Sequence, residues 1–277
     1  GDQDGELMPK LLIAGYGFLG RALESKFEAG GWQVSKLNRS GTDGAIACDL
    51  SSADDVAALP DGYDLIIHCA ASGGGGEESY RKVYLEGCRS LLRRYPNTRF
   101  IFTSSTSVYP QEDHSIVSES SEANPTSPTA QVLRETEQLV LQAGGVVARL
   151  SGLYGPGRCH VLKSVLSGEA RIDGRGERIM NFVHRDDVAD AMILLATMES
   201  FPSGEIYNIT AEPVSQHDCF FALSEHFAVP MPEQRQGEVK RKRGNSSKRV
   251  SNSKLKSLGW QPTHQDFLSL ALACQTG

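Results

Sequence analysis

The residues whose type and spacing best suit a chemical task are three glycines near the start of the chain, Gly15, Gly17 and Gly20. They follow the apolar run Leu11–Ala14 and precede an amphipathic stretch, so the sequence predicts a strand, a tight turn and the start of a helix. Gly15 permits the positive φ of a sharp turn, Gly17 leaves room for a pyrophosphate, and Gly20 lets the helix pack close to the strand. The pattern indicates a dinucleotide-binding turn.

This glycine turn, residues 15–20, would hold a cofactor mainly through its backbone. The N–H groups at the start of the helix carry about half a positive charge toward the phosphates. Glycine turns also serve plain strand–helix packing, but the position directly after the first strand favours a cofactor. The residues predicted to bind it here are Gly15, Tyr16, Gly17, Phe18, Leu19 and Gly20.

The end of the second predicted strand bears on the choice of dinucleotide. NAD sites place an acidic residue about 20 residues after the glycine turn, where it binds the ribose 2′-hydroxyl. Here the chain reads Leu37-Asn38-Arg39-Ser40 and has no acid from there until Asp43. The Arg39 guanidinium suits a 2′-phosphate, which favours NADP over NAD, with an ordinary exposed arginine as the alternative. Asp49, after the third strand, is placed to meet the adenine edge, although a surface acid before a helix gives the same pattern.

Apolar and amphipathic segments alternate through the first half of the chain. Such alternation predicts an α/β fold with a doubly wound parallel sheet of the Rossmann type. The expected strands are Leu11–Gly15, Gln33–Leu37, Ala45–Cys48, Leu65–Cys69, Arg99–Thr103 and Val146–Leu150.

Beyond Tyr154 the alternation weakens, although Gly204–Ile209 has the pattern of one more strand. We expect a dinucleotide-binding Rossmann domain over residues 9–153 and a smaller C-terminal substrate lobe over 154–277, with about 181–211 returning to the main sheet. The basic run Lys240–Arg243 is interpreted as a solvated loop, with phosphate or carboxylate binding as the alternative.

The composition argues against several other classes of protein. The 277 residues are 39% hydrophobic, enough for one large or two modest cores, and the net charge of -6 argues against generic nucleic-acid binding. No apolar segment reaches the ~20 residues of a membrane span, and residues 1–10 contain no signal-peptide core. The six cysteines lack metal-ligand spacing, so we predict no metal site and expect reduced, mostly buried thiols in a cytoplasmic protein.

Several longer motifs follow the glycine turn in one order along the chain. They are Cys48-Asp49-Leu50, His68-Cys69-Ala70-Ala71, Phe102-Thr103-Ser104-Ser105-Thr106-Ser107-Val108-Tyr109, Arg149-Leu150-Ser151-Gly152-Leu153-Tyr154-Gly155-Pro156-Gly157, Asn181-Phe182-Val183-His184-Arg185-Asp186-Asp187-Val188-Ala189, Tyr207-Asn208-Ile209 and Leu258-Gly259-Trp260-Gln261-Pro262. Together they resemble the extended short-chain dehydrogenases/reductases, the NAD-dependent epimerase/dehydratase family, nearly end to end.

The resemblance implies where a cofactor and a substrate would bind. The cofactor is expected over the N-terminal sheet, with Leu50, Cys69, Ala70 and Ala71 beside it. The C-terminal lobe is expected to close over a small polar substrate, often a nucleotide sugar. Members of the family often form homodimers through a helix bundle, which here would include the helix after Pro125.

The chain departs from the family at the residues that transfer the proton. The family uses a tyrosine and a lysine four residues apart on one helix face, where the lysine lowers the tyrosine pKa. Thr129 and Leu133 stand at these positions, and Tyr-x-x-x-Lys occurs nowhere in the chain. Ser105 keeps the place of the family's serine. This pattern resembles the atypical YeeZ-like members, which retain the fold and the cofactor turn but lack the pair.

Another residue would have to supply the proton. Tyr84 stands where the family has an asparagine near the catalytic centre, so we predict it as a non-standard donor; the alternative is an aromatic residue packed on a helix. Tyr109 and His184 are further candidates, although both positions commonly have structural roles. Two functions remain open: an NAD(P)-dependent oxidoreductase or epimerase, and a non-catalytic NADP(H)-binding sensor or partner-binding protein.

Overall fold

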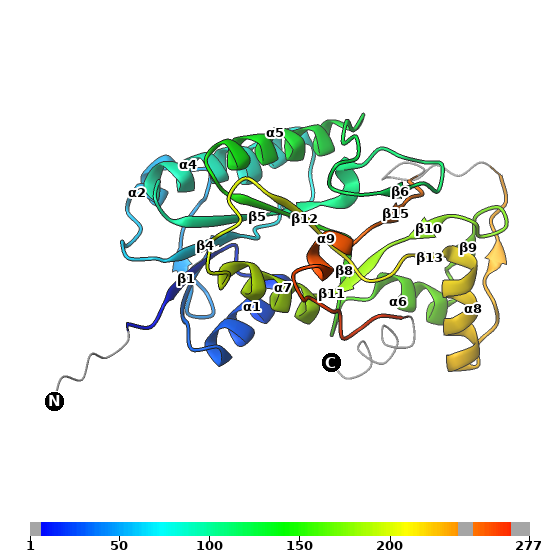
Figure 1. Cartoon of the computed structure of the whole chain (residues 1–277). Coiled ribbons are helices and arrows are strands. Elements are labelled where there is room, and N and C mark those ends of the chain that lie inside the picture. The colour runs from blue at the N-terminus through cyan, green and yellow to red at the C-terminus, as the bar shows by residue number, and fades with distance from the viewer. Residues whose placement is uncertain (1–6, 238–245, 267–277) are drawn as a thin grey trace. The chain divides into compact units, whose positions relative to one another are not determined.

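The structure is a computed structural model that describes residues 7–237 and 246–266 (Figure 1). The basic run Lys240–Arg243 lies outside these residues. The chain forms two compact units, each built from several segments. Unit 1 comprises Gly1–Ser105, Pro125–Ala148 and Ala189–Ile206, and unit 2 comprises Thr106–Asn124, Arg149–Val188 and Tyr207–Gly277. The lobes 9–153 and 154–277 stay a prediction.

A seven-stranded sheet with the order β12-β7-β5-β4-β1-β2-β3 forms the framework of unit 1. The pairings of β1 with β2 and β4, of β2 with β3 and of β4 with β5 are all parallel. The order reverses at β1, which is the Rossmann-type arrangement that the sequence predicts. The strands are β1 (Lys10–Ala14), β2 (Gln33–Asn38), β3 (Ile46–Ala47), β4 (Leu65–His68), β5 (Arg99–Ser105), β7 (Val146–Leu150) and β12 (Ile206–Ile209).

Helices cover both faces of this sheet. In Figure 1, α4 (Gly87–Arg94) and α5 (Pro128–Gln142) lie on one side of the sheet, and α1 (Phe18–Ala29) and α7 (Arg185–Ala196) lie on the other. Because both faces are covered, β4 is buried along its whole length, as is β1 from Leu11 to Ala14. The sheet therefore leaves its carboxyl edge as the place where polar side chains and turns gather.

The helices of unit 1 begin and end where their sequences favour it. The sequence pattern predicts that Phe18, Ala22, Leu23 and Phe27 mark one face of α1; Ala22, Leu23 and Phe27 are buried there together with Leu19, and Phe18 is half-buried. The short helix α2 (Ala53–Ala57) begins after Ser52, whose side chain accepts a hydrogen bond from Asp55 N.

The helical segment between β4 and β5 is not one regular α-helix. It divides into α3 (Glu77–Tyr80), the π-helix η1 (Arg81–Glu86) and α4.

Unit 2 consists of short elements, which fits the weak alternation of its sequence. Its strands pair in twos: β10 (Ile179–Met180) with β13 (Val214–Ser215), β11 (Phe182–His184) with β8 (Gly152–Tyr154), β14 (Glu233–Gln234) with β9 (Arg171–Ile172), and β15 (Arg249–Val250) with β6 (Ile116–Val117). The helical elements are η2 (Thr106–Val108), α6 (His160–Ser167), α8 (Gln216–Phe227) and α9 (Ser253–Lys256). Buried side chains of α6 and α8, including Leu162, Val165, Phe220 and Leu223, form a separate hydrophobic core.

Among the cysteines that the structure describes, Cys159 differs from the sequence expectation. Four of them, Cys48, Cys69, Cys88 and Cys219, are free thiols, and burial raises the pKa of each. Cys159 is disulfide-bonded, so the expectation of reduced thiols is wrong there. Sequence spacing misses this bond because it does not reveal which cysteines the fold brings together.

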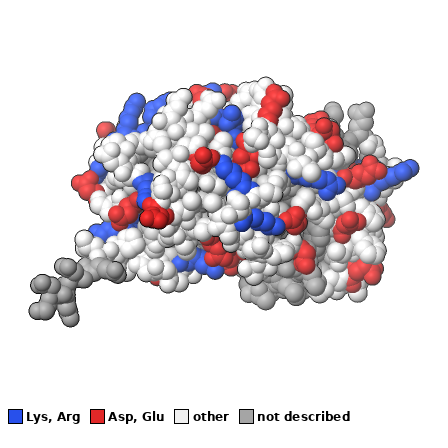
Figure 2. Space-filling model, in the orientation of Figure 1, with Lys and Arg blue, Asp and Glu red and all other residues white. Residues whose placement is uncertain are grey.

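Within residues 7–237 and 246–266, no group of three or more His, Cys, Asp or Glu side chains is placed to hold a metal ion. No described helix combines the length and the apolar character needed to cross a membrane. On the face drawn in Figure 2, acidic and basic side chains are interspersed.

Candidate functional site

Gly15 lies at the closest approach between the glycine turn and the segment that follows β4. Its φ is 107°, and a Cβ built on it would lie 2.2 Å from the Ala70 Cα. The turn is also tied to β2, because Gly15 N and Tyr16 N both donate to Leu37 O, at 3.3 and 2.7 Å. Only glycine fits here, because both the backbone conformation and the neighbouring backbone exclude a side chain.

Gly17 and Gly20 have different surroundings. A Cβ on Gly20 would lie 3.2 Å from Gly15 O and 3.3 Å from Ile13 Cγ2, so this glycine permits the close packing of α1 on β1. A Cβ on Gly17 would meet nothing within 4 Å, and its φ of -147° is not positive. No side chain caps the helix at Gly17. The start of α1 therefore faces open space at Gly17, and a side chain at Gly17 would enter that space.

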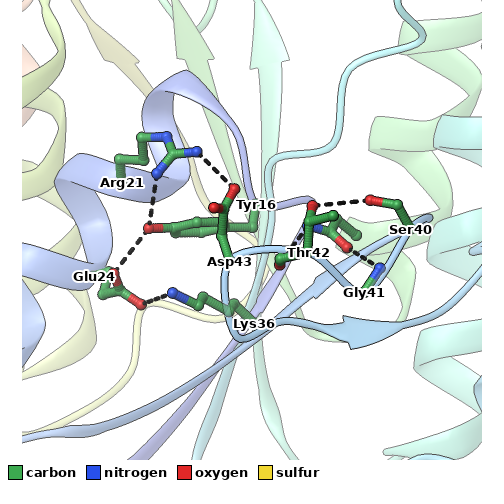
Figure 3. Close-up of polar contacts among 9 residues, drawn as sticks. Tyr16, Arg21, Glu24, Lys36, Ser40, Gly41, Thr42 and Asp43 are labelled. Carbon is green, nitrogen blue, oxygen red and sulfur yellow. Dashed lines mark hydrogen bonds and ion pairs between the residues drawn. The ribbon is translucent and has the colours of Figure 1, made fainter.

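The loop after β2 is held in shape by Asn38. Its Oδ1 accepts a hydrogen bond from Gly41 N at 2.6 Å, and its Nδ2 donates to Thr42 O and Oγ1 at 3.1 and 3.2 Å (Figure 3). The Ser40 and Thr42 hydroxyls also lie in hydrogen-bond contact, 2.9 Å apart. The residue at the position of the NAD-type acid therefore uses its whole amide to fix the loop.

Beside this loop, Tyr16 lies at the centre of a charged cluster that the sequence analysis missed. Its ring lies between two cations, with Lys36 Nζ at 4.1 Å and the Arg21 guanidinium at 4.9 Å from the ring centroid (Figure 3). The Tyr16 hydroxyl donates to Glu24 Oε1 at 2.9 Å. Lys36 pairs with Glu24 at 2.7 Å and Arg21 with Asp43 at 3.1 Å. We call these five residues the Tyr16 cluster.

Hydrogen bonds to the two carboxylates raise the pKa of both cations in this cluster, that of Lys36 through Glu24 and that of Arg21 through Asp43. No local motif predicts the cluster, because its members come from the glycine turn, α1, β2 and the following loop.

Arg39 and Asp49 lie near each other after β2 and β3. The Arg39 side chain is 87% exposed, and its Nη2 lies 3.8 Å from Asp49 Oδ2. Asp49 Oδ1 accepts hydrogen bonds from Ser51 Oγ at 2.7 Å and Ser51 N at 2.9 Å, which lower the pKa of Asp49. Leu50 is buried beside it. These residues leave an exposed guanidinium and an ionised carboxylate at this edge.

The segment after β4 is linked to the glycine turn. Cys69 N donates to Ala14 O at 2.9 Å, and Cys69 Sγ donates to Gly15 O at 3.2 Å. Ala70 is half-buried and Ala71 is exposed. The predicted contact residues Cys69, Ala70 and Ala71 therefore adjoin the turn through Cys69 and Ala70.

Tyr84 lies on η1 within an aromatic cluster. Its ring centroid lies 5.0 Å from that of Tyr80, 6.0 Å from that of His68 and 6.1 Å from that of Phe102. Burial raises the pKa of Tyr84, while hydrogen bonding with Ser72 acts in the opposite direction. His68 Nε2 bonds to Val83 O at 2.9 Å, and burial lowers the pKa of His68 to about 4, so the ring is neutral and donates this bond. The raised pKa of Tyr84 means that its phenol is protonated at neutral pH.

The helix that would carry the family's catalytic pair is α5. It begins after Ser127, whose side chain accepts a hydrogen bond from Ala130 N. Thr129 is half-buried, and Leu133, one turn later, is 5% exposed. Arg81 of η1 contacts Glu135 of α5 at 3.0 Å, which joins the two helices. An apolar side chain thus occupies the lysine position.

Ser105 ends β5 and is half-buried. The preceding residue points to α5, where the Ser104 hydroxyl donates to the fully buried Glu137 at 2.7 Å. Alternation along the strand directs Ser105 to the other face from Ser104.

The two other proposed proton carriers belong to unit 2. Tyr109 is 1% exposed, and its hydroxyl donates to Asn208 Oδ1 at 2.7 Å. His184 stacks on His264 with ring centroids 3.9 Å apart, and its Nδ1 accepts a hydrogen bond from Asp186 N at 3.0 Å. Burial and the neighbouring His264 lower the pKa of His184. Both side chains have structural partners.

Solved structures with the same fold come from several bacteria. A protein of Methylobacillus flagellatus assigned to the NAD-dependent epimerases/dehydratases is 26% identical, with a TM-score of 0.80 over 98% of each chain. The UDP-glucose 4-epimerase of Thermotoga maritima, solved with UDP-glucose, is 21% identical, with a TM-score of 0.80 over 95% of this chain and 97% of that one. The UDP-glucuronic acid 4-epimerase of Bacillus cereus, solved with NAD, is 22% identical, with a TM-score of 0.79 over 96% and 97%.

Sequence comparison identifies the family. The chain is 35% identical to Protein YeeZ of Escherichia coli (strain K12) over 233 residues, which cover 77% of this chain and 82% of that protein. Residues 11–210 match the model of the NAD dependent epimerase/dehydratase family. This match includes the glycine turn, the loop after β2, Tyr84, Ser105 and α5. The chain therefore belongs to the NAD dependent epimerase/dehydratase family.

Proposed function

We propose that the chain binds NADP(H), or NAD(H) more weakly, at the carboxyl edge of β1, β2 and β4 in unit 1. The observation that carries this proposal is the open space at Gly17, beside a helix start that no side chain caps. The order of the strands reverses between β4 and β2, at β1, and ligands of open α/β sheets bind at such a switch point.

Different residues along this edge would contact different parts of the cofactor. The glycine turn would hold the pyrophosphate through the backbone N–H groups at the start of α1. Arg39 and the loop held by Asn38 would receive the adenosine ribose and its 2′-phosphate, and Asp49 and Leu50 the adenine. Cys69, Ala70 and Ala71 would lie along the middle of the cofactor. When bound, the nicotinamide supplies a hydride acceptor or donor.

We propose an oxidoreductase or epimerase that acts on a small polar substrate resembling a nucleotide sugar. Two of the solved structures with the same fold are a UDP-glucose 4-epimerase and a UDP-glucuronic acid 4-epimerase, which supports this substrate class. Ser105 would donate a hydrogen bond to a substrate oxygen. Tyr84 would supply the proton that the family's tyrosine supplies elsewhere, because it stands where the family has a residue near the catalytic centre, although burial raises the pKa of its phenol and so weakens it as an acid.

A non-catalytic NADP(H)-binding role is the second candidate. The buried Leu133 favours it, because an apolar side chain at the lysine position can neither lower a tyrosine pKa nor hold the nicotinamide ribose. Under this alternative the cofactor site is retained and the proton-transfer site is lost.

Turnover by matched variants separates the two candidates. The protein is incubated with NAD⁺ or NADP⁺ and UDP-glucose or UDP-glucuronic acid, and the sugar products are identified by NMR. Tyr84→Phe removes the proposed donor, and Tyr80→Phe removes a hydroxyl from the same aromatic cluster as the control. Turnover in the parent and in Tyr80→Phe but not in Tyr84→Phe supports Tyr84. Turnover equal in all three excludes it, and tight cofactor binding without turnover favours the non-catalytic role.

A further inference from the structure

Arg21 of the Tyr16 cluster is already paired with an anion of the protein itself. Its Nη2 lies 3.1 Å from Asp43 Oδ2, and Figure 3 shows the Asp43 side chain pointing toward the guanidinium. Asp43 has a φ of 56°, which is uncommon for any residue but glycine. The two flanking glycines, Gly41 and Gly44, also have positive φ, at 72° and 77°. The loop is thus folded so that it presents Asp43 to Arg21.

The two ion pairs of the cluster differ in how firmly they are held. The side chains of Lys36 and Glu24 are 15% and 22% exposed, and Glu24 is held further by the Tyr16 hydroxyl. The side chains of Arg21 and Asp43 are 52% and 55% exposed. Solvent screens a half-exposed pair strongly, so Arg21 can exchange its partner easily while Lys36 cannot.

The proposed cofactor site would bring a 2′-phosphate toward the loop that carries Asp43. The ribose 2′ position of a bound dinucleotide lies at the end of the second strand, beside residue 38. Asp43 is five residues further along the loop that Asn38 holds, and Arg21 is on the first turns of α1 next to the glycine turn. Arg39 is exposed at the same strand end. A phosphate bound there could be contacted by two guanidinium groups, those of Arg39 and Arg21. The Arg21 group is already paired with Asp43.

We infer that Asp43 is an internal anion that occupies Arg21 until the 2′-phosphate of NADP(H) displaces it, so that Asp43 tunes the preference for NADP(H) over NAD(H). The inference rests on the proposed cofactor site. A phosphate dianion accepts two charge-assisted hydrogen bonds from a guanidinium, and the released Asp43 carboxylate is already half in water. NAD(H) has only a hydroxyl at this position and leaves the Arg21–Asp43 pair intact.

The test uses two ligands that differ by the phosphate alone, 2′,5′-ADP and 5′-AMP, titrated calorimetrically at low and fixed ionic strength. Asp43→Asn frees Arg21, and asparagine tolerates the positive φ. It should tighten 2′,5′-ADP binding by roughly threefold or more, since the competing half-exposed ion pair is gone, and leave 5′-AMP unchanged. Arg21→Gln should weaken 2′,5′-ADP roughly tenfold and leave 5′-AMP unchanged, because a charge-assisted contact is lost.

Two controls separate displacement from a general change in charge. Asp61→Asn removes the same charge from an exposed aspartate that pairs with Arg94, before the amino end of β4, and should change neither affinity. In the double variant Asp43→Asn with Arg21→Gln, the gain from Asp43→Asn should vanish, because no guanidinium is left to free. A gain of the same size in the double variant reflects general electrostatics and overturns the inference.

The other outcomes also have defined meanings. If the parent prefers 2′,5′-ADP but Asp43→Asn leaves that affinity unchanged or weakens it, the role of Asp43 is wrong while the proposed NADP(H) site stands. If the parent binds both ligands equally, the proposed preference for NADP(H) fails, and the inference fails with it.

Discussion

The Cβ position of Gly15 lies 2.2 Å from the Cα of Ala70, so the glycine turn and the segment after β4 meet backbone to backbone. This contact lies at the strand where the order of the sheet reverses. It explains one glycine of the motif by the fold alone, whereas Gly17 has open space around its Cβ position. The motif therefore combines two packing glycines with one that no packing contact requires.

Gly15→Ala should lower the free energy of unfolding by about 2–4 kcal/mol, because the methyl group meets the Ala70 backbone and the residue is held at positive φ. Gly62→Ala is the matched control: Gly62 has a φ of 98°, but its Cβ would meet nothing within 4 Å. It should cost about 1 kcal/mol, the backbone strain alone. Denaturant unfolding measures both, and equal losses would show that the Ala70 contact relaxes without effect.

Arg39→Ala should weaken NADP⁺ binding roughly ten- to a hundredfold and change NAD⁺ binding little, because the proposed contact of the guanidinium with the cofactor is with the 2′-phosphate. Arg93→Ala, which removes an exposed arginine from α4, is the control. Calorimetric titration gives both affinities. A parent protein that binds NAD⁺ more tightly than NADP⁺ would contradict the proposed preference.

The pH dependence of turnover should report Tyr84. Burial raises the pKa of Tyr84 above its ordinary value of 10, so the phenol remains protonated through neutral pH. A reaction that uses it as an acid should therefore lose rate on the basic side only above pH 10. Initial rates measured across pH test this. A loss of rate near pH 6 to 7 would point instead to a histidine.

Leu133→Lys should destabilise the fold and not restore the family's pair. Leu133 is 5% exposed, so the substitution buries an ammonium group among apolar side chains. We expect a loss of about 3 kcal/mol or more in unfolding free energy. Gln138→Lys, on an exposed position of the same helix, should be nearly neutral. If the two variants unfold at the same denaturant concentration, the lysine at residue 133 has found water or a partner.

His68 should make the stability depend on pH. Burial lowers its pKa from 6.5 to about 4 in the folded protein, so the unfolded chain binds a proton first as the pH falls. The stability is complete above pH 6.5 and should decrease toward pH 4, by about 3 kcal/mol for this group. His68→Gln keeps a hydrogen-bond donor for Val83 O and removes the titrating group. The stability that this variant loses between pH 7 and 4 should therefore be about 3 kcal/mol less than the parent loses. If the unfolding free energies of the parent and His68→Gln fall equally with pH, the lowered pKa of His68 is contradicted.

Local patterns predicted much of this molecule. The turn at Gly15, the buried face of α1 and the alternation of strands and helices depend on residues close in sequence, and all are present. The Tyr16 cluster escaped prediction because it joins residues from separate segments around one ring. The π-helix at Tyr84 and the disulfide at Cys159 escaped for the same reason, since each depends on tertiary contacts.

The absence of the catalytic pair was readable because it concerns residue types at fixed spacing on one helix. The effect of this absence on the site could not be predicted from the sequence, because the surroundings of Tyr84 and Leu133 are set by β4, β5 and η1 together. Sequence alone names the missing groups, and only the packing tells whether another side chain replaces them.

Calorimetric titration of NADP⁺ into the parent, Gly17→Val and Gly76→Val tests the cofactor site most directly. A Cβ at either glycine meets nothing within 4 Å, and neither residue has a positive φ, so all three proteins should unfold at the same temperature. We predict that the parent and Gly76→Val bind NADP⁺ and that Gly17→Val does not, because only its side chain fills the space before α1. Equal affinities in the parent and Gly17→Val would contradict the account.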